Sequence, residues 1–397
     1  MAEPALVIDA APSALFLPRD AGISRRPRLD KRPRPADFLD AFEAHALYYD
    51  IFWHADGRRV LMVGPPPVNL KGLYKGARFT ALPSGRALKA RRYRSLSVMT
   101  TALMDVPPDT TAIAVSMAGM EMQAPPGRSL VPAFAGRRIL FTMNKDNDLD
   151  WIRFWAAHHA GQHGTDAVVV FDNGSRRYGT ENIAETLASV PGVQVVATPS
   201  WPWAFGRTDP AVSVDPYWAH FLQIASMGVL LRRFGAKAEA ILNCDIDELA
   251  YAPDGASIYA LARGTSHGLL AMKGQWVEPV PEPGTEPRDH ADFPFRLRNA
   301  KARFCRAGKW AIEPTRPWLQ RLGVHPYWHW IEGRPLLAKR YAGGAFFWHF
   351  RGINTGWKED RTGSEPDFSG LERDPVLAAT LPEVTSMRRP AKAASPA

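Results

Sequence analysis

The sequence predicts an α/β protein with a Rossmann-like, mostly parallel sheet and helices on both faces, preceded by a small all-β module. From about residue 137 onward, apolar strand-like segments alternate with helical segments, a pattern typical of βαβ units and a parallel sheet. Before that point, residues 37–135 form short apolar segments separated by turn residues. One such turn, Ala55-Asp56-Gly57, lies between two apolar runs and indicates a hairpin.

Four segments follow from these patterns. Residues 1–36 are rich in Pro and Arg and are expected to be irregular, residues 37–135 form the β module, residues 137–380 form the α/β domain, and residues 381–397 form a disordered tail. The turn residues Pro125-Pro126-Gly127 mark the exit from the β module.

The α/β domain is expected to contain three strand-helix units before an acidic motif. In order, these are a strand at 137–143, a helix from Asp150, a strand at 166–171, a helix at 180–190, a strand at 193–198 and a helix over about 216–234. An apolar run at 240–244 then forms the next strand. In such sheets ligands bind in the crevice beyond the carboxyl ends of the strands.

Composition limits the partners of the protein. A formal net charge of +9 over 397 residues favours anionic partners, such as nucleotides, phosphorylated lipids or a membrane surface, without choosing among them. The interleaved basic and aromatic residues of single-strand binders are not evident, so nucleic acid is not an expected partner. Only two cysteines are present, Cys244 and Cys305, which favours a reducing compartment.

The sequence also bears on localisation. It lacks a secretory signal pattern, and no apolar segment approaches the roughly 20 residues that cross a bilayer. We therefore expect a cytoplasmic protein, with peripheral contact to the inner face of the membrane left open.

The segment "ILNCDIDELA" at residues 241–250 carries the functional prediction. If the strand stays extended, Asp245 and Asp247 point the same way, about 7 Å apart, while Ile246 points into the core. Two such carboxylates favour a hard cation, Mg²⁺ or Mn²⁺, that can also bind a diphosphate. Glu248 is expected on the other face, where its hydrogen bonds would hold the loop.

Structural alternatives exist for these acids. An Asp-x-Asp pair can lie in a solvated turn or cap a helix, although the preceding apolar strand favours a metal site here. Asp172 in "FDNGS" can be only a turn former, but it too lies at the expected end of a strand.

Several ordered motifs resemble bacterial GT-A-fold glycosyltransferases of the family 2 and family 92 (DUF23-like) type. They are "MNKDNDLDWIRFWAAHHAGQHGTDAVVVFDNGS", "LNCDIDEL", "GKWAIEP", "GVHPYWHW" and "WHFRGINTGWK". The resemblance covers about residues 137–360 and excludes the β module. It implies a nucleotide-diphosphate sugar donor, a divalent metal as cofactor, Mn²⁺ or Mg²⁺, and transfer of the sugar to an acceptor hydroxyl.

The resemblance also assigns roles to residues. Asp245 and Asp247 match the metal-binding pair, and His325 and His349 match two late histidines, of which His325 is expected to complete the metal shell. Asn144, Asp146, Asp172, Asn173 and Ser175 match strand-end segments that contact the nucleotide, as Asp245 does through the metal, although Lys145 stands where the family usually has Glu. By the resemblance, Arg351 and Lys358 would supply positive charge to the phosphates. The weaker candidates are Glu248, His349, Lys358 and Gln223, the last because it lies on a helix leading toward the acidic strand.

The resulting hypothesis is a metal-dependent, inverting hexosyltransferase of bacterial polysaccharide biosynthesis. The acceptor would be a polysaccharide or a lipid-linked glycan. The catalytic base is not identified, because nothing in the sequence singles out Asp289 or another carboxylate. One alternative is a metal-dependent phosphohydrolase or nucleotidyltransferase that uses the same acids. A second is a non-catalytic carbohydrate-binding protein, suggested by the basic charge and the β module.

Overall fold

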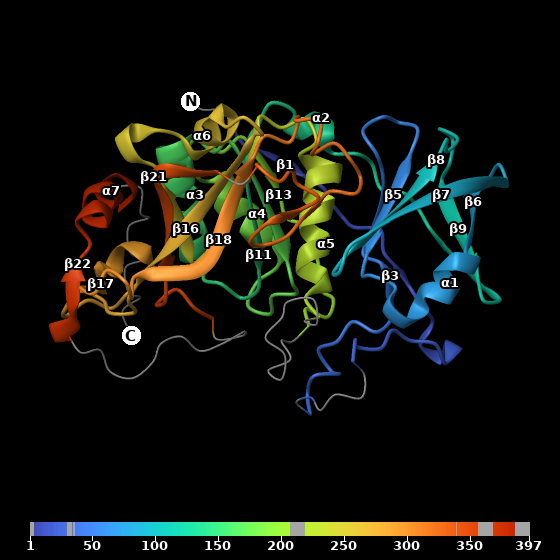
Figure 1. Cartoon of the computed structure of the whole chain (residues 1–397), viewed down its shortest axis with the longest axis horizontal. Helices are drawn as coiled ribbons and strands as arrows, with labels where there is room; N and C mark the ends of the chain where they lie inside the picture. The colour runs from blue at the N-terminus through green and yellow to red at the C-terminus, as the bar shows by residue number, and fades with distance from the viewer. Residues whose placement is uncertain are drawn as a thin grey trace, which may run out of the picture.

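The computed structural model describes residues 4–29, 34, 36–206, 219–338, 340–355 and 368–385. Its largest element is a nine-stranded sheet in the order β1-β13-β12-β11-β14-β18-β16-β21-β15 (Figure 1). These strands are β1 Leu6–Ile8, β13 Val195–Ala197, β12 Ala167–Asp172, β11 Arg138–Asn144, β14 Ala240–Asn243, β18 Phe304–Ile312, β16 Leu269–Val277, β21 Arg340–Phe350 and β15 Glu248–Tyr251.

The sheet changes character at β14. The first five strands in this order are all parallel. Beyond β14 the pairs β14/β18, β18/β16 and β21/β15 are antiparallel, and β16/β21 is parallel. The expected α/β class with a mostly parallel sheet is confirmed, and the antiparallel part is an addition that the sequence did not predict.

Helices cover both faces of the sheet, as expected. On one face pack α3 Leu149–His163, α4 Thr180–Ala188, α6 Ile258–Gly264 and α7 Pro375–Thr385. On the other pack α2 Val131–Phe134 and α5 Phe221–Val229, which continues into the π-helical turn η4 Leu230–Phe234. The side chains of β11 alternate accordingly, because Leu140 joins the first core and Phe141 the second.

A second, seven-stranded sheet lies within residues 50–124. Its order is β10-β9-β6-β7-β8-β5-β4, and every neighbouring pair is antiparallel. The strands are β4 Asp50–Trp53, β5 Val60–Gly64, β6 Arg78–Leu82, β7 Arg86–Arg94, β8 Met99–Met104, β9 Ala112–Met117 and β10 Met120–Ala124, and the short helix α1 Lys71–Gly76 precedes β6. The predicted hairpin at Asp56-Gly57 joins β4 to β5.

Smaller elements complete the fold. Two-stranded pairs are β2 Leu15–Phe16 with β3 Ala46–Tyr48, β17 Phe295–Leu297 with β22 Leu371–Arg373, and β19 His325–Pro326 with β20 Ile331–Glu332. Short 3₁₀ turns are η1 Arg19–Ala21, η2 Val68–Leu70, η5 Pro253–Gly255, η6 His290–Asp292 and η7 Phe368–Gly370.

Each end of the chain contains a regular element that the sequence did not predict. The N-terminal segment is mostly irregular, but β1 pairs with β13 and forms an edge of the large sheet. At the other end, α7 continues to Thr385, so residues 381–385 are helical. The rest of the expected tail lies outside the described residues.

One hydrophobic core lies between the two sheets and takes side chains from both. Helix α5 lies between the two sheets (Figure 1). The core there contains Leu61 and Val63 of β5 together with Leu222 and Val229 of α5, and it continues into η4. A buried ion pair reinforces the contact, with Arg233 Nη1 lying 2.9 Å from Asp50 Oδ2. The β module is therefore packed firmly against the α/β domain.

Within the described residues, none of the helices has both the length and the apolar character needed to cross a bilayer.

We expect Asp50→Ala to destabilise the protein by about 3–5 kcal/mol, because it leaves the buried Arg233 guanidinium without its carboxylate partner. Urea unfolding followed by circular dichroism measures this loss. Arg58→Ala is the matched control, since it breaks the exposed Arg58–Asp105 pair and should cost less than about 1 kcal/mol. Equal losses in the two variants would contradict the prediction.

Candidate active site

The candidate site lies at the carboxyl ends of β11, β12 and β14. Strands β12 and β13 lie on one side of β11, and β14 lies on the other. The winding of the chain therefore reverses at β11, and such switch points are where open α/β sheets bind ligands. Asn144, Asp172 and the acidic motif all come at or directly after these strand ends.

The predicted strand-end residues are brought together. Asn144 Nδ2 donates to Asp172 Oδ1 at 2.7 Å and to Ser175 Oγ at 3.1 Å. Ser175 in turn donates to Asp172 Oδ1 at 2.6 Å and accepts from the backbone N–H of Asp146 at 2.8 Å. Asn173 donates from Nδ2 to the backbone carbonyls of Trp201 and Trp203. This cluster fixes the loops that follow β11 and β12.

The side chain of Asp172 closes a turn, which is the structural alternative considered for this residue. Its Oδ2 accepts from the backbone N–H of Ser175 at 2.9 Å, and the carboxylate is almost fully buried. Asp146 has a left-handed backbone, with φ of 54°, and its Oδ1 accepts from the backbone N–H groups of Arg176 and Arg177. Internal donors therefore hold both carboxylates in place.

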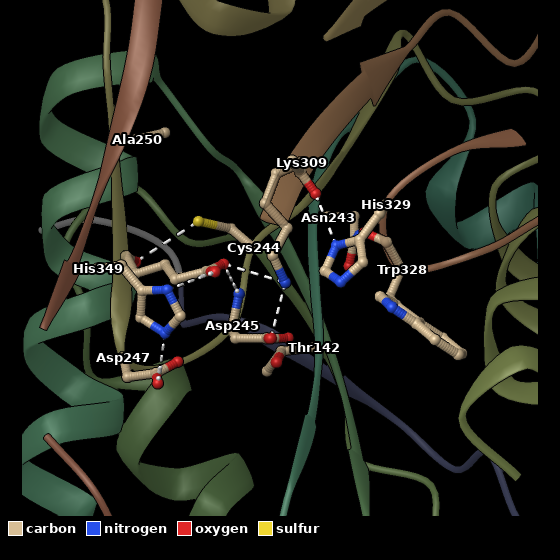
Figure 2. A network of polar contacts seen from close by, with 12 residues as sticks. Thr142, Asn243, Cys244, Asp245, Asp247, Ala250, Lys309, Trp328, His329 and His349 are labelled. Carbon is tan, nitrogen blue, oxygen red and sulfur yellow. Dashed lines mark hydrogen bonds and ion pairs between the residues drawn. The ribbon is translucent and has the colours of Figure 1, made fainter. Parts of the chain in front are cut away.

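The acidic motif does not continue the strand. β14 ends at Asn243, and a turn follows that is closed by the backbone N–H of Glu248 donating to the carbonyl of Asp245 at 3.0 Å. The extended geometry expected for Asp245 and Asp247 is therefore wrong, and the two carboxylates go to different partners (Figure 2). Ile246 is buried in the core, as expected.

Asp245 is held by a lysine that the sequence analysis did not select. Lys309 Nζ lies 2.7 Å from Asp245 Oδ2 and 3.1 Å from Glu248 Oε2, and the lysine is almost fully buried. Burial opposes the charged form, but the two carboxylates outweigh it and raise the pKa of Lys309. Burial raises the pKa of Glu248, which Lys309 partly offsets. The sequence does contain a signal for this ion pair, because a lysine inside the otherwise apolar strand segment "AGKWAI" needs a buried acidic partner.

Asp247 belongs to a second group with Glu248 and His349. One ligand atom from each of the three lies within 4.8 Å of the others. His349 Nε2 lies 3.0 Å from Asp247 Oδ2, and its Nδ1 lies 3.7 Å from Glu248 Oε1. Glu248 and His349 are directly opposite in the β15/β21 ladder. Burial lowers the pKa of His349, but Asp247 reverses this and raises it to about 10.

This group fits a divalent cation by its donor chemistry. Two carboxylates and an imidazole are ligands that Mn²⁺ accepts, and carboxylates suit Mg²⁺. Glu248 has both expected and unexpected contacts. Its Oε2 accepts from the backbone N–H of Asp245 at 2.8 Å, which holds the turn as predicted, while Oε1 faces His349.

The remaining candidates are distributed as follows. His325 is not in this group; it lies on β19, where burial and then Arg232 lower its pKa to about 4. Gln223 is buried on α5, and Lys358 lies outside the described residues. Arg351 lies just past the end of β21, where its guanidinium sits 4.5 Å from the centre of the Trp276 ring.

The sequence did not predict two further residues that lie near the acids, Trp276 and His329. Trp276 also stacks on His349, with ring centres 4.3 Å apart, so it connects His349 to Arg351. His329 has Nδ1 2.9 Å from the carbonyl of Gly308. Burial, followed by the charge of Lys309, lowers the pKa of His329 to about 4.

Histidines of α3 hold the strand β15, which follows the acidic turn. His158 Nε2 and His163 Nε2 lie 2.7 and 2.9 Å from the carbonyl of Ala250, and the backbone N–H of Ala250 donates to His159 Nε2 at 3.2 Å. Ala250 belongs to β15, which begins at Glu248. His158 and His159 are fully buried side chains of α3.

Comparisons with known proteins give distant similarities. No protein-family model and no curated protein matches the chain. Among solved structures it is similar to the bifunctional glycosyltransferase WbbM, at 13% identity and a TM-score of 0.24, over 43% of this chain and 27% of that chain. It is also similar to the galactosyltransferase LgtC in complex with donor and acceptor sugar analogues, at 14% identity and a TM-score of 0.30, over 64% of this chain and 98% of that chain.

An active-site mutant of LgtC gives 12% identity and a TM-score of 0.28 over the same shares of the two chains. The chain thus spans 27% of the length of WbbM and nearly all of LgtC. Likeness at these TM-scores carries no argument about function.

We expect Lys309→Met to destabilise the protein by about 3–5 kcal/mol, because it leaves the buried Glu248 carboxylate without its cation. Urea unfolding at neutral pH measures the loss. The double variant Lys309→Met/Glu248→Gln should recover a large part of it, since the neutral amide needs no counter-charge. No recovery in the double variant would show that packing, and not the ion pair, is what Lys309 contributes.

We expect the free energy of unfolding to fall as the pH falls from about 6.5 towards 4. Burial lowers the pKa of His158 to about 3 and that of His163 to about 4, so between these pH values the unfolded chain binds protons that the folded chain does not. Each histidine then contributes a slope of up to about 1.4 kcal/mol per pH unit. In urea titrations between pH 6.5 and 5, His163→Gln should reduce the slope; an unchanged slope would contradict this assignment.

Proposed function

We propose that the protein is a metal-dependent GT-A-type glycosyltransferase that moves a sugar from a nucleotide-diphosphate donor to a polysaccharide or lipid-linked acceptor. The observation that carries the proposal is the grouping of Asp247, Glu248 and His349 around the turn that follows the carboxyl end of β14. The order of the sequence motifs supports the same reading. The proposal includes a bacterial origin and inversion at the anomeric carbon, which rest on the resemblance, and a cytoplasmic location, which rests on the sequence composition.

In this proposal Asp247, Glu248 and His349 hold Mn²⁺ or Mg²⁺. When bound, the ion would stabilise the negative charge on the departing nucleotide diphosphate. The chain itself contributes Arg351, whose planar guanidinium suits phosphate oxygens and is held over Trp276. Lys309 keeps Asp245 and Glu248 in position beside the ion site.

The strand-end cluster of Asn144, Asp172 and Ser175 would form the wall for the nucleotide. Its hydrogen bonds are satisfied internally, so it would contribute shape and backbone groups more than free carboxylates. Asn173 and Asp146 hold the adjoining loops. Nucleotide selectivity would therefore depend on how these loops are held.

The catalytic base stays unassigned. Asp289 is buried, and its Oδ1 accepts from the backbone N–H of Ala291 at 3.0 Å at the start of η6. This contact gives Asp289 a structural task in the turn. The next residue, His290, lies with Nε2 2.7 Å from the carbonyl of Ile246, inside the acidic turn.

The main alternative is a phosphohydrolase or nucleotidyltransferase, which would use the same acids. A transferase releases nucleotide diphosphate from a nucleotide sugar in proportion to an added acceptor. A hydrolase releases phosphate from nucleotides without any acceptor. A non-catalytic carbohydrate-binding protein would release neither.

We expect Asp247→Asn to remove Mn²⁺-dependent binding of nucleotide diphosphate, lowering the affinity at least about tenfold because a charged ligand of the ion is lost. Isothermal titration calorimetry with a panel of nucleotide diphosphates, with and without Mn²⁺, measures this. Asp254→Asn, an acid in the separate turn η5, is the matched control and should bind like the parent protein. Parent-like, Mn²⁺-dependent binding by the Asp247→Asn variant would end the metal-site proposal.

A further inference from the structure

The turn after β20 carries two strongly exposed leucines. Leu336 is 99% and Leu337 is 74% exposed, and they occupy the centre of a turn closed by the backbone N–H of Ala338 donating to the carbonyl of Pro335 at 3.0 Å. The base of this turn is anchored, since Ile331 and Ala338 are fully buried in the main core. The exposure therefore belongs to a held turn and not to a loose end.

Two arginines bind the base of the turn. Arg334 Nη1 donates to the carbonyl of Ile331, and Arg321 Nη2 donates to the carbonyl of Gly333. In the sequence Lys339 and Arg340 follow directly. Leucines at a tip, with cations at its base, are the pattern that binds an anionic membrane surface.

A third exposed leucine lies on a connected turn. Leu96, between β7 and β8, is 48% exposed and follows the exposed Arg94. The Tyr327 hydroxyl lies 2.8 Å from Ser95 Oγ and accepts from the backbone N–H of Ser97 at 3.2 Å. The hairpin β19/β20 thus joins the two turns.

We propose that Leu336 and Leu337 insert into the interface of an anionic lipid bilayer, while the arginines at the base of the turn contact lipid phosphates. A protein partner fits less well, because a specific interface needs on the order of 1,000 Å² of complementary surface, and two leucines on a narrow turn do not supply it. Insertion of a tip into lipid needs no matching shape.

The same hairpin reaches the candidate active site. Asn243 Nδ2 donates to the carbonyl of Trp328 at 3.0 Å, and Trp310 Nε1 donates to the carbonyl of Tyr327. Asn243 precedes the acidic turn, and Trp310 follows Lys309. A membrane-bound turn would therefore hold the site near the bilayer, which selects a lipid-linked acceptor over a soluble polysaccharide; this last step rests on the proposed function.

Sedimentation of the full chain with lipid vesicles tests the proposal. The protein should bind phosphatidylcholine vesicles that contain about 30% phosphatidylglycerol, bind pure phosphatidylcholine less, and lose binding as salt is added. The variant Leu336→Asp/Leu337→Asp should lower the partition coefficient at least about tenfold. Leu39→Asp, at another exposed leucine, is the matched control and should bind like the parent protein.

Two outcomes would overturn the proposal. One is parent-like vesicle binding by the double variant, or no binding of anionic vesicles by the parent protein. The other is a parent dimer in light scattering that the double variant abolishes, which would assign the leucines to a second copy of the chain. Mn²⁺-dependent binding of nucleotide diphosphate should be the same in the double variant and in the parent protein, because the leucines lie outside the ion site. If the parent protein itself does not bind nucleotide diphosphate, that result contradicts the proposed function and leaves the membrane proposal standing.

Discussion

The buried ammonium group of Lys309 is the interaction on which the candidate site depends. It neutralises charge on Asp245 and Glu248 at the point where the parallel strands end. A buried carboxylate such as Glu248 is costly without a partner, so the acidic turn could not fold back over the sheet on its own. Lys309 reaches this position because β18 runs antiparallel beside β14, pairing Trp310 with Asn243. The change from parallel to antiparallel pairing is thus what brings a cation to the acids.

The acidic turn is held on its other side by neutral histidines. His158, His159 and His163 bind both backbone groups of Ala250, and His290 lies within hydrogen-bond distance of the carbonyl of Ile246. A turn fixed from both sides keeps its carboxylates in one arrangement before any ligand arrives. Such preorganisation is what an ion or a charged substrate requires of a binding site.

The sequence predicts the local part of this design and misses the long-range part. Strands β11, β12 and β14 and the gathering of Asn144 and Asp172 follow from alternating patterns and from the common edge of parallel strands. The pairing of His349 with Glu248 follows from the register of β21 on β15, which no local pattern encodes, because positions 248 and 349 are 101 residues apart in the chain. The sequence prediction placed His325 in the metal group in place of His349 for the same reason, because it could not show this long-range pairing. The extended geometry assumed for Asp245 and Asp247 failed because the chain turns directly after Asn243.

The charges of the acidic turn and its two cations indicate how the group would respond to a divalent ion. With all three carboxylates ionised, Asp245, Asp247 and Glu248 face two cations, Lys309 and protonated His349. Metal binding needs the neutral imidazole, so a divalent ion would replace the proton of His349 and leave the group balanced. Lys309 would stay on Asp245, which therefore acts on the ion through charge and through the turn. A diphosphate would then bring negative charge that this group cannot neutralise. In the proposed function Arg351, which lies over Trp276 next to His349 and 3.8 Å from Glu278, would be a cation to meet it.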